Sequence, residues 1–514
     1  MSGANAVERF VLAPASSDRG GVAIIDAPTG TTHTRADVAA GSARVAATVS
    51  RLGVQPEQRV MLCLADTVAF LWWFWGVMRI GAVPVPVSTM LTEADHRFLL
   101  EDSRAVGLVV SPPFESTAGA AASDQPFLRW KISDTDELDA AESAPPVFPS
   151  TDDDIAFWLY TSGTTGFPKG AMHRHIDMGF CTDTYASGVL GMGPTDIVYS
   201  VAKLFFAYGL GNAGYFPAAT GAAAVLNPAR PVPEEVADHV ARYRPTLFFG
   251  VPTFYAGLLA SDVDDGAFSS VRLAVSAGEP LPADLHRRVG ERFGMEVLDG
   301  LGTTEASHIF LSNRPGLSVP GTTGTPVEGY EVELRDDQGQ PAPDGEPGAL
   351  FVAGESVTVG YWNRTALNRQ ALMGRFMATG DTYRREADGN YVCLGRTDDM
   401  LKVGGMWVSP TEVEGCILEL DEVLQAAVVG MVDSDGLTKP RAFVVASGGD
   451  TGDLAERVQA HVRSRLAPYK YPRQVEVVAE LPTTATGKVK RYLLREGAAE
   501  GAAPERSTPG GAAP

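Results

Sequence analysis

The first 320 or so residues of this 514-residue chain are organised around short apolar runs rich in β-branched residues, each followed by Gly, Pro or Thr. The clearest runs are RVMLCLA (59–65), AVGLVVS (105–111), DDIAFWLYT (153–161), TLFFGVP (246–252), VRLAVSAGEPLP (271–282) and MEVLDGLGTTE (295–305). Between residues 21 and 110 they alternate with helix-like stretches, which predicts α/β units with parallel strands. Open α/β sheets bind ligands in loops that follow their strands, so we expect a site in these Gly- and Thr-rich segments.

The pattern of apolar residues and turns changes after about residue 320. In GYEVELRDDQGQPAPDGEPGALFVAG (329–354), alternating apolar residues are broken by D-G, P-G and Q-G turns, which predicts antiparallel β structure. A smaller α+β unit is expected after GRTDDMLKVGG (395–405), with a helix over 453–466. The predicted fold is therefore α/β. A large N-terminal domain (1–397) has α/β subdomains and a β-rich subdomain, a small mobile α+β domain covers 398–496, and a disordered tail covers 497–514.

Composition excludes several classes of protein. The net charge of −21 argues against nucleic acid as a partner, because phosphate backbones require a basic surface. The four cysteines lie far apart with no C-x-x-C pair, which is typical of buried thiols in a reducing cytosol rather than of a disulfide framework or a zinc site. The N-terminus lacks the apolar core of a signal peptide, and the longest apolar run, residues 68–78, is too short to span a bilayer. These features predict a cytoplasmic protein without a membrane anchor.

The run at 153–161 leads directly into a glycine loop, and together they read YTSGTTGFPKGAMHRH over residues 160–175. The loop lacks the Walker pattern, because Lys169 stands three places after Gly166 and is followed by Gly170. Successive Gly, Ser and Thr residues can still form a nest of backbone N–H donors for an anion, and Lys169 adds a positive charge. Taken alone, such a loop is more often a simple turn than a phosphate site.

The whole string resembles the signature of the class I adenylate-forming enzymes, which include acyl- and aryl-CoA synthetases, nonribosomal adenylation domains and luciferases. Four further segments stand in that family's order: DGLGTTE (299–305), ATGD (378–381), GRTDDMLKVGGMWVSPTEVE (395–414) and LPTTATGKVKR (481–491). The resemblance covers roughly residues 20 to 496. It implies that the chain joins a carboxylate to the α-phosphate of ATP and expels pyrophosphate, a reaction that depends on charge stabilisation around phosphates.

The resemblance also assigns roles to residues of these motifs. The residues implied at the β- and γ-phosphates are Thr161, Ser162, Gly163, Thr164, Thr165, Gly166 and Lys169. Thr304 is implied at the α-phosphate, and Glu305 as a ligand of Mg²⁺, which prefers hard carboxylate oxygens. Asp381 would accept hydrogen bonds from the ribose, with Arg396 beside it. The residues implied around adenine and the α-phosphate are Gly278, Glu279, Pro280, Asp299, Gly300, Leu301, Gly302 and Thr303.

Five further positions bear on the adenine, on adenylate formation and on the second half of the reaction. Leu301 stands where the family often has an aromatic residue, so aliphatic packing must replace ring stacking on the adenine. Lys488 matches the family lysine that orients the carboxylate and neutralises the adenylation transition state. Asp398 matches the hinge about which the small domain turns. Gly404 and Gly405 match the strand that lines a pantetheine tunnel, which implies an acceptor with a pantetheine arm, either coenzyme A or an acyl carrier protein.

Three other motifs suggest sites that we do not favour. GLGNAG (209–214) fits G-x-G-x-x-G, but it follows no clear first strand of a dinucleotide-binding unit. HRH (173–175) resembles metal ligands but has no Cys or His partners nearby in the sequence. FLWWFW (70–75) resembles a base-stacking surface but lacks interleaved Lys or Arg, so we expect it in the core.

The carboxylate substrate is indicated by two segments, KLFFAYGLGN (203–212) and EASHIFLSN (305–313), which look most like benzoate and hydroxybenzoate CoA ligases. The resemblance puts the aryl ring between them, against Phe206, Ala207, Tyr208, Gly209, His308 and Ile309. A flat apolar ligand suits a pocket of this composition. For His308, a hydrogen-bonded place in the core is an equal alternative to substrate contact.

The acceptor is less clearly indicated. Residues 457–495 carry nine Lys or Arg against two acids, which suits the phosphates of CoA, an acidic acyl carrier protein, or simply a solvated helix face. The leading hypothesis is an ATP- and Mg²⁺-dependent benzoate-type CoA ligase, and the first alternative is a ligase that loads a carrier protein. A non-catalytic nucleotide-binding homologue is the second alternative. The presence of Lys169, Glu305, Asp381, Arg396 and Lys488 argues against it.

Overall fold

The structure is a computed structural model, and it describes residues 5–161, 168–403, 406–432, 437–448, 452–483, 489–491 and 493–495. The chain divides into two compact units. Unit 1 comprises Met1–Thr379 and Tyr383–Val392, and unit 2 comprises Gly380–Thr382 and Cys393–Pro514. The predicted α/β class with a large first and a small second part is confirmed. The predicted boundary after residue 397 lies a few residues beyond Val392 and stays a prediction.

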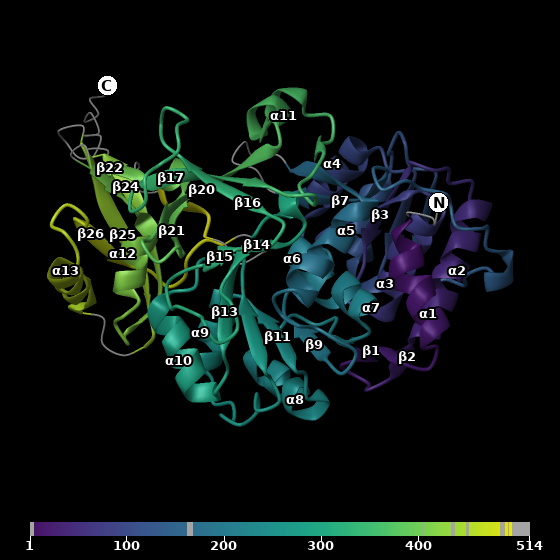
Figure 1. The fold of residues 1–514 in the computed structure, drawn as a ribbon, viewed down its shortest axis with the longest axis horizontal. Helices are drawn as coiled ribbons and strands as arrows, with labels where there is room; N and C mark the ends of the chain where they lie inside the picture. Colours follow the sequence, from purple (N-terminus) through teal and green to yellow (C-terminus); the bar gives the residue numbers. More distant parts are fainter. Residues whose placement is uncertain are drawn as a thin grey trace, which may run out of the picture. The chain divides into compact units, whose positions relative to one another are not determined.

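Nine strands form the largest sheet of the described part of unit 1, in the order β15-β14-β13-β12-β11-β9-β10-β1-β2 (Figure 1). The strands from β13 to β1 pair in parallel, whereas β2, β14 and β15 pair antiparallel at the two edges. Their bounds are β1 (Val22–Asp26), β2 (Thr32–Thr34), β9 (Ile197–Ser200), β10 (Ala223–Leu226), β11 (Leu247–Gly250), β12 (Leu273–Ser276), β13 (Val297–Gly302), β14 (Ile309–Ser312) and β15 (Thr325–Pro326). The strands predicted from the runs at 246–252, 271–282 and 295–305 are therefore confirmed, and they pair in parallel.

A second, parallel sheet has the order β4-β3-β5-β6, and a small antiparallel sheet has the order β18-β8-β7. The strands are β3 (Arg59–Cys63), β4 (Val83–Pro86), β5 (Gly107–Val110), β6 (Trp130–Ser133), β7 (Ile155–Thr161), β8 (Lys169–Arg174) and β18 (Gly360–Tyr361). The aromatic run FLWWFW lies in α3 (Val68–Arg79), where Trp73 and Phe74 are completely buried. Its expected place in the core is confirmed. Helix α2 (Arg35–Arg51) packs closely on α3. Gly41 of α2 makes this possible, since a Cβ there would meet the Trp72 ring at 2.3 Å.

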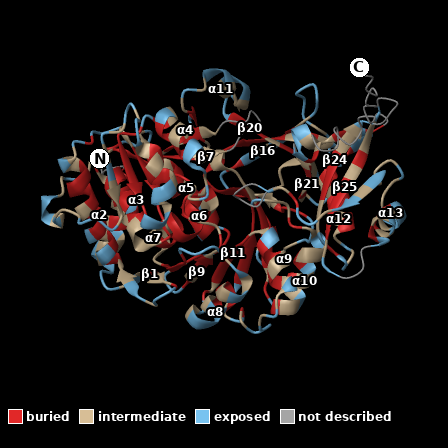
Figure 2. Cartoon of the chain, turned by 180° about the vertical axis from the view of Figure 1, so that it is seen from behind, coloured by how far each residue is buried: buried red, intermediate tan, exposed pale blue. Residues whose placement is uncertain are grey.

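The helices of unit 1 bury apolar faces against these sheets and expose their polar faces (Figure 2). One core cluster joins Tyr199 of β9 and Phe248 of β11 to Phe254 and Val289 of two covering helices. The remaining α-helices are α1 (Ala13–Ser17), α4 (Glu93–Ser103), α5 (His175–Cys181), α6 (Ala207–Leu210), α7 (Phe216–Thr220), α8 (Pro233–Tyr243), α9 (Pro252–Ala260), α10 (Ala283–Phe293) and α11 (Thr365–Ala371). The short helices are η1 (Glu8–Leu12), η2 (Pro112–Phe114), η3 (Glu115–Gly119), η4 (Ala120–Ala122), η5 (Ala141–Ser143), η6 (Thr182–Ser187), η7 (Gly211–Tyr215) and η8 (Thr304–Ala306).

The segment after residue 329 forms the antiparallel structure that its turns predict. Strand β16 (Glu331–Arg335) pairs with β17 (Pro347–Ala353), so that Glu331 lies opposite Ala353. The same sheet contains β19 (Leu372–Met373), β20 (Phe376–Arg385) and β21 (Tyr391–Arg396). Strands β20 and β21 each contribute residues to both units, because the chain crosses between the units there.

Unit 2 is a small α+β unit with its own core. Its elements are η9 (Thr397–Asp399), β22 (Leu401–Val403), β23 (Met406–Val408), α12 (Pro410–Ile417), β24 (Val423–Val432), β25 (Thr438–Ala446), α13 (Leu454–Arg465) and β26 (Gln474–Val477). Val413 and Ile417 of α12 share one apolar cluster with Val458 and Val462 of α13. The expected helix over 453–466 is confirmed. In the part of the chain described, none of the helices combines the length and apolar character that crossing a bilayer requires.

Candidate active site

A short turn follows β13 and carries the two motif residues Thr304 and Glu305. Thr303 caps helix η8, because its side chain accepts a hydrogen bond of 3.1 Å from the backbone N–H of Ala306. The next residue, Ser307, has a φ of 64°, a region that residues other than glycine rarely adopt. Such strain persists only where the surroundings hold the backbone in place. The turn therefore presents Thr304 and Glu305 in a fixed conformation at the end of a parallel strand.

The surroundings that hold this turn include His173, from the HRH segment of β8. Its Nε2 donates a hydrogen bond of 2.8 Å to the carbonyl oxygen of Thr304, and its Nδ1 lies 2.7 Å from the hydroxyl of Ser307. The Asp177 carboxylate lies 3.1 Å from the same Nδ1, and both side chains are completely buried. The HRH segment thus supports the turn from within the core. Sequence reasoning considered it only as a metal motif and missed this role.

Tyr361 of β18 joins two residues that the motifs predict to act together. Its hydroxyl donates a hydrogen bond of 2.6 Å to Glu305 Oε1, and Lys169 Nζ donates one of 3.2 Å to the Tyr361 oxygen. The Lys169 ammonium also lies 4.2 Å from the centre of the Tyr361 ring. Tyr361 pairs with Ala171 of β8, two residues after Lys169, and this register places the phenol beside the lysine. No motif in the sequence pointed to Tyr361.

The glycine loop lies between two paired strands. Thr161 ends β7 and lies directly opposite Lys169, which begins β8. The two ends of the loop are therefore fixed next to each other. The remaining predicted phosphate residues, Ser162, Gly163, Thr164, Thr165 and Gly166, lie outside the described residues.

The residues expected near adenine lie where β12 and β13 end side by side. Ser276, the last residue of β12, is opposite Asp299 of β13, and Gly278, Glu279 and Pro280 follow β12. Asp299 is buried, and burial raises the pKa of its carboxyl group to about 8. Its Oδ2 accepts a hydrogen bond of 3.3 Å from Thr323, whereas its Oδ1 and the hydroxyl of Ser276 have no partner among the described residues. Buried polar atoms without partners are rare, so these two are candidates to contact a ligand.

The glycines of the DGLGTTE motif allow β13 and β14 to approach closely. A Cβ on Gly300 would meet the Ile309 side chain at 2.8 Å, and one on Gly302 would meet the His308 carbonyl oxygen at 2.6 Å. Between them, Leu301 is partly exposed, and its packing on the adenine stays a prediction. Ile309 itself is almost completely buried.

The structure brings the two predicted aryl segments together at Tyr208 and His308. The His308 ring lies 5.6 Å from the Tyr208 ring and 4.5 Å from the Phe216 ring, measured between centroids. Burial lowers the pKa of His308 to about 3, so the imidazole is neutral. Its Nε2 lies 3.0 Å from Asn212 Oδ1, while its buried Nδ1 has no partner within the described part of the chain. His308 is thus a hydrogen-bonded core residue, and contact with a substrate stays a prediction.

The other predicted aryl residues are chain neighbours of Tyr208 and His308. Ala207 and Gly209 are buried in helix α6, and Phe206 lies just before it, with its ring 4.6 Å from that of Phe205. A Cβ on Gly209 would meet the Lys203 carbonyl oxygen at 2.1 Å, so this position requires glycine. The GLGNAG segment continues as buried helix η7. It is therefore part of the core of unit 1.

Within unit 2, Asp381 and Arg396 form an ion pair. Arg396 Nη1 donates a hydrogen bond of 2.9 Å to Asp381 Oδ1, and the Asp381 carboxylate is largely buried. The predicted hinge residue Asp398 lies in η9, directly after β21. The predicted tunnel residues Gly404 and Gly405, and the predicted catalytic Lys488, lie outside the described residues.

Most of the basic residues between 457 and 495 that the structure describes have partners inside unit 2. Lys470 lies 2.6 Å from Glu412, Arg491 lies 2.8 Å from Glu414, and Arg463 lies over the Tyr471 ring. Arg457 pairs with Asp453, and Arg495 pairs with Asp399. These contacts favour the structural interpretation of the basic run over a surface for CoA or a carrier protein.

Comparison with known proteins agrees with this arrangement. Residues 13–362 match the family model described as AMP-binding enzyme, and residues 412–488 match the model described as AMP-binding enzyme C-terminal domain. The chain belongs to the AMP-binding enzyme family, as its motifs predict. A 4-hydroxybenzoate–CoA/benzoate–CoA ligase of Rhodopseudomonas palustris is 44% identical over 508 residues, which are 96% of this chain and 94% of the ligase.

Two solved structures are also similar to the chain. A benzoate CoA ligase from Burkholderia xenovorans LB400 is 41% identical with a TM-score of 0.88, over 96% of this chain and all of that one. An anthranilate CoA ligase in complex with anthranoyl-AMP is 36% identical with a TM-score of 0.91, over 96% of this chain and 97% of that one. The fold of this chain is therefore that of an adenylate-forming ligase.

Proposed function

We propose that the chain is an AMP-forming ligase that activates benzoate or a substituted benzoate with ATP and transfers the aroyl group to CoA. The observation that carries this proposal is 44% identity, over 96% of the chain, to a ligase of 4-hydroxybenzoate and benzoate. The aromatic surroundings of His308 and Tyr208 support it, because they suit a flat apolar acid. The reaction is expected in the cytoplasm, where ATP and CoA are available.

In the first half-reaction, a carboxylate oxygen attacks the α-phosphorus, and the bond to the bridging oxygen of the β-phosphate breaks, so that pyrophosphate leaves. Lys169 and the residues that follow Thr161 offer positive charge and N–H donors to the β- and γ-phosphates. Asp381, oriented by Arg396, accepts hydrogen bonds from the ribose, and Gly278 to Pro280 flank the adenine.

The residues near Lys169 suit Mg²⁺ as the companion of ATP. Glu305 offers a carboxylate oxygen, the ligand type that Mg²⁺ prefers, and the hydroxyl of Tyr361 fixes the orientation of that carboxylate at 2.6 Å. When bound, the ion neutralises charge on the phosphates. Tyr361 then acts as a positioning residue, because it touches Glu305 and Lys169 at the same time.

In the second half-reaction, the thiol sulfur of CoA attacks the aroyl carbonyl carbon and releases its proton to solvent, and AMP leaves with the electrons of the broken acyl–oxygen bond. Lys488 serves only the first step, in which it orients the carboxylate and neutralises the transition state. Unit 2 then turns about Asp398, and Gly404 and Gly405 line the path of the pantetheine arm.

A substrate panel tests this proposal. Benzoate, 4-hydroxybenzoate, 2-aminobenzoate, acetate and palmitate are compared in ATP–pyrophosphate exchange, and each adenylate is then offered CoA or a phosphopantetheinylated carrier protein. We expect exchange to be far faster with the three aryl acids, and CoA to be the better acceptor. A preference for palmitate would exclude the aryl pocket, and transfer only to the carrier protein would favour the loading ligase. Absence of exchange with every acid would favour a non-catalytic homologue.

A further inference from the structure

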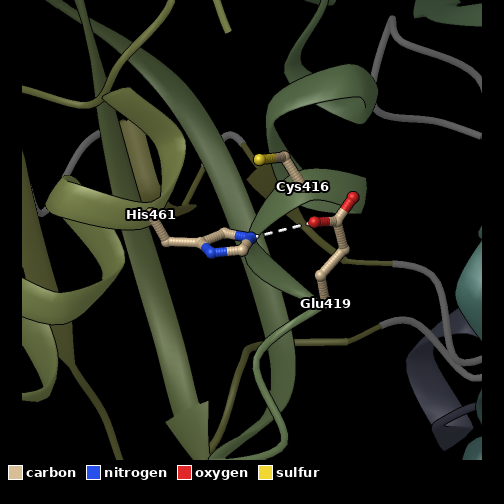
Figure 3. Close-up of side chains that lie close together, drawn as sticks. All are labelled: Cys416, Glu419 and His461. Carbon is tan, nitrogen blue, oxygen red and sulfur yellow. Dashed lines mark hydrogen bonds and ion pairs between the residues drawn. The ribbon is translucent and has the colours of Figure 1, made fainter. Parts of the chain in front are cut away.

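Three side chains with different ligand chemistry meet between helices α12 and α13 of unit 2 (Figure 3). They are Cys416 of α12, Glu419 just after that helix, and His461 of α13. The cysteine sulfur, a carboxylate oxygen and an imidazole nitrogen all lie within 4.8 Å of one another. His461 Nε2 and Glu419 Oε2 are 2.9 Å apart and form a hydrogen bond.

The fold fixes this arrangement from both sides. Glu419 follows Cys416 by three residues, and its N–H donates a hydrogen bond of 3.3 Å to the Cys416 carbonyl oxygen, so one helical turn presents both side chains on the same face. His461 reaches them from α13, whose residues Val458 and Val462 pack into the same apolar cluster as Cys416 itself. Cys416 is therefore held in a packed core, His461 extends from a helix that packs into the same core, and Glu419 joins them from the turn that follows α12.

Thiolate, imidazole and carboxylate are the groups that bind zinc in proteins. A tetrahedral ion with bonds of about 2.0–2.3 Å separates its ligand atoms by about 3.3–3.8 Å. The spacing seen here is within a small side-chain adjustment of that value. We propose that Cys416, Glu419 and His461 bind one Zn²⁺ ion, with water as the fourth ligand, and that the ion links α12 to α13.

The proposed site differs in chemistry from the Mg²⁺ position at Glu305. A sulfur ligand selects zinc over magnesium, since Mg²⁺ prefers oxygen ligands in octahedral geometry. The proposed role is also different: the ion would stabilise the packing of unit 2, and it would take no part in adenylate formation. The inference is therefore independent of the proposed ligase activity.

Neighbouring charges modify the expected affinity. Burial, assisted by the negative charge of Glu419, raises the pKa of the Cys416 thiol to about 11; Glu412 acts in the same direction and Arg465 opposes it. Zinc binding must therefore displace the thiol proton, so one proton leaves per ion and the affinity rises with pH. Arg465 Nη1 lies 3.6 Å from Glu419 Oε2, and this positive charge disfavours a cation nearby. Its side chain is 60% exposed, so it can turn away into solvent.

Cobalt titration of the full-length, metal-stripped protein tests the site. We expect one equivalent of Co²⁺ to produce a sulfur-to-cobalt charge-transfer band in the near ultraviolet, and Zn²⁺ to abolish it by displacement. Cys416→Ser should remove the band. Cys393→Ser is the matched control, because Cys393 is the other cysteine of unit 2, and it should leave the band unchanged.

Two further variants keep the test decisive if Cys416→Ser lowers the amount of folded protein. His461→Gln changes a more accessible side chain and should weaken Co²⁺ binding by at least ~10-fold, since even indirect partners of metal ligands contribute that much. Arg465→Gln should strengthen binding by removing the neighbouring positive charge. No charge-transfer band in the wild type, a band that survives Cys416→Ser, or unchanged affinity in both His461→Gln and Arg465→Gln would overturn the proposal.

Discussion

Removal of a single hydroxyl, by Tyr361→Phe, tests whether Tyr361 organises the phosphate end of the site. The substitution deletes the group that donates to Glu305 at 2.6 Å and accepts from Lys169 at 3.2 Å. It keeps the aromatic ring that lies 4.2 Å from the Lys169 ammonium, so the cation–π contact and the packing survive. Only the orientation of Glu305 and Lys169 is disturbed.

The expected loss of activity in Tyr361→Phe depends on how exposed Glu305 and Lys169 are. A hydrogen bond to a charged group contributes about 1.5–3 kcal/mol when it is buried. Tyr361 is buried, but Glu305 and Lys169 are partly exposed, and solvent screening reduces the contribution to about 1–2 kcal/mol. That energy corresponds to a loss of about 5- to 30-fold in kcat/KM for ATP. Because Glu305 would bind Mg²⁺, the Mg²⁺ concentration for half-maximal activity should also rise.

The assay is ATP–pyrophosphate exchange with benzoate across a series of Mg²⁺ concentrations. Tyr243→Phe is the control, because its hydroxyl donates a hydrogen bond of 2.7 Å to the carbonyl oxygen of Ala27, outside the candidate site. The control should leave both the ATP and the Mg²⁺ dependence unchanged. If Tyr361→Phe stayed within twofold of the wild type at every Mg²⁺ concentration, the positioning role assigned to Tyr361 would be wrong.

Five further substitutions address the rest of the site. His173→Gln should lower both the melting temperature and the rate of adenylation, because it disturbs the buried hydrogen bonds of His173 with Thr304 and Ser307. Unchanged thermal unfolding would show that the turn does not need these hydrogen bonds. Asp381→Ala should raise KM for ATP without unfolding the protein, and an unchanged KM would remove it from the ribose site. Burial raises the Asp299 pKa from 3.8 to about 8, so between these pH values the folded protein holds a proton that the unfolded chain releases. The contribution of Asp299 to the free energy of unfolding is therefore lost as pH rises from about 4 to about 8. Asp299→Asn should flatten that part of the stability profile measured by denaturant unfolding, whereas an identical slope would contradict the assignment. Lys488→Ala should slow aryl-adenylate formation by ~10²-fold or more yet spare thioester formation from pre-made benzoyl-AMP. Asp398→Pro should instead spare adenylate formation and slow thioester formation, since a fixed φ restricts the hinge. Equal slowing of both steps by Lys488→Ala would refute the alternation of domains.

The sequence by itself determined the class of fold and the order of the motifs. Short apolar runs that end in Gly, Pro or Thr predicted the strands β11, β12 and β13, because the burial of a strand is visible in the residue types of that strand alone. The turns of 329–354 predicted antiparallel pairing for the same reason. Glu305 and Lys169 were predicted as site residues because each lies inside a contiguous motif.

Tertiary structure alone decided which residues support those motifs. Tyr361 is 56 residues from Glu305 and 192 from Lys169, and it reaches both only because β18 pairs with β8. His173 lies 131 residues before Thr304, and in the sequence it is simply one of two histidines in an HRH segment.

Ion pairs and metal ligands likewise depend on residues that lie far apart in the sequence. The basic run after residue 457 suggested a surface for an anionic partner, but the acids that neutralise it, Glu412 and Glu414, come from α12. Cys416 and His461 have no C-x-x-C or H-x-x-H spacing, and they meet because α12 packs on α13. The physical reason is common to all these residues. A local pattern records whether a side chain is buried, whereas its partner is fixed by the packing of elements far apart in the chain.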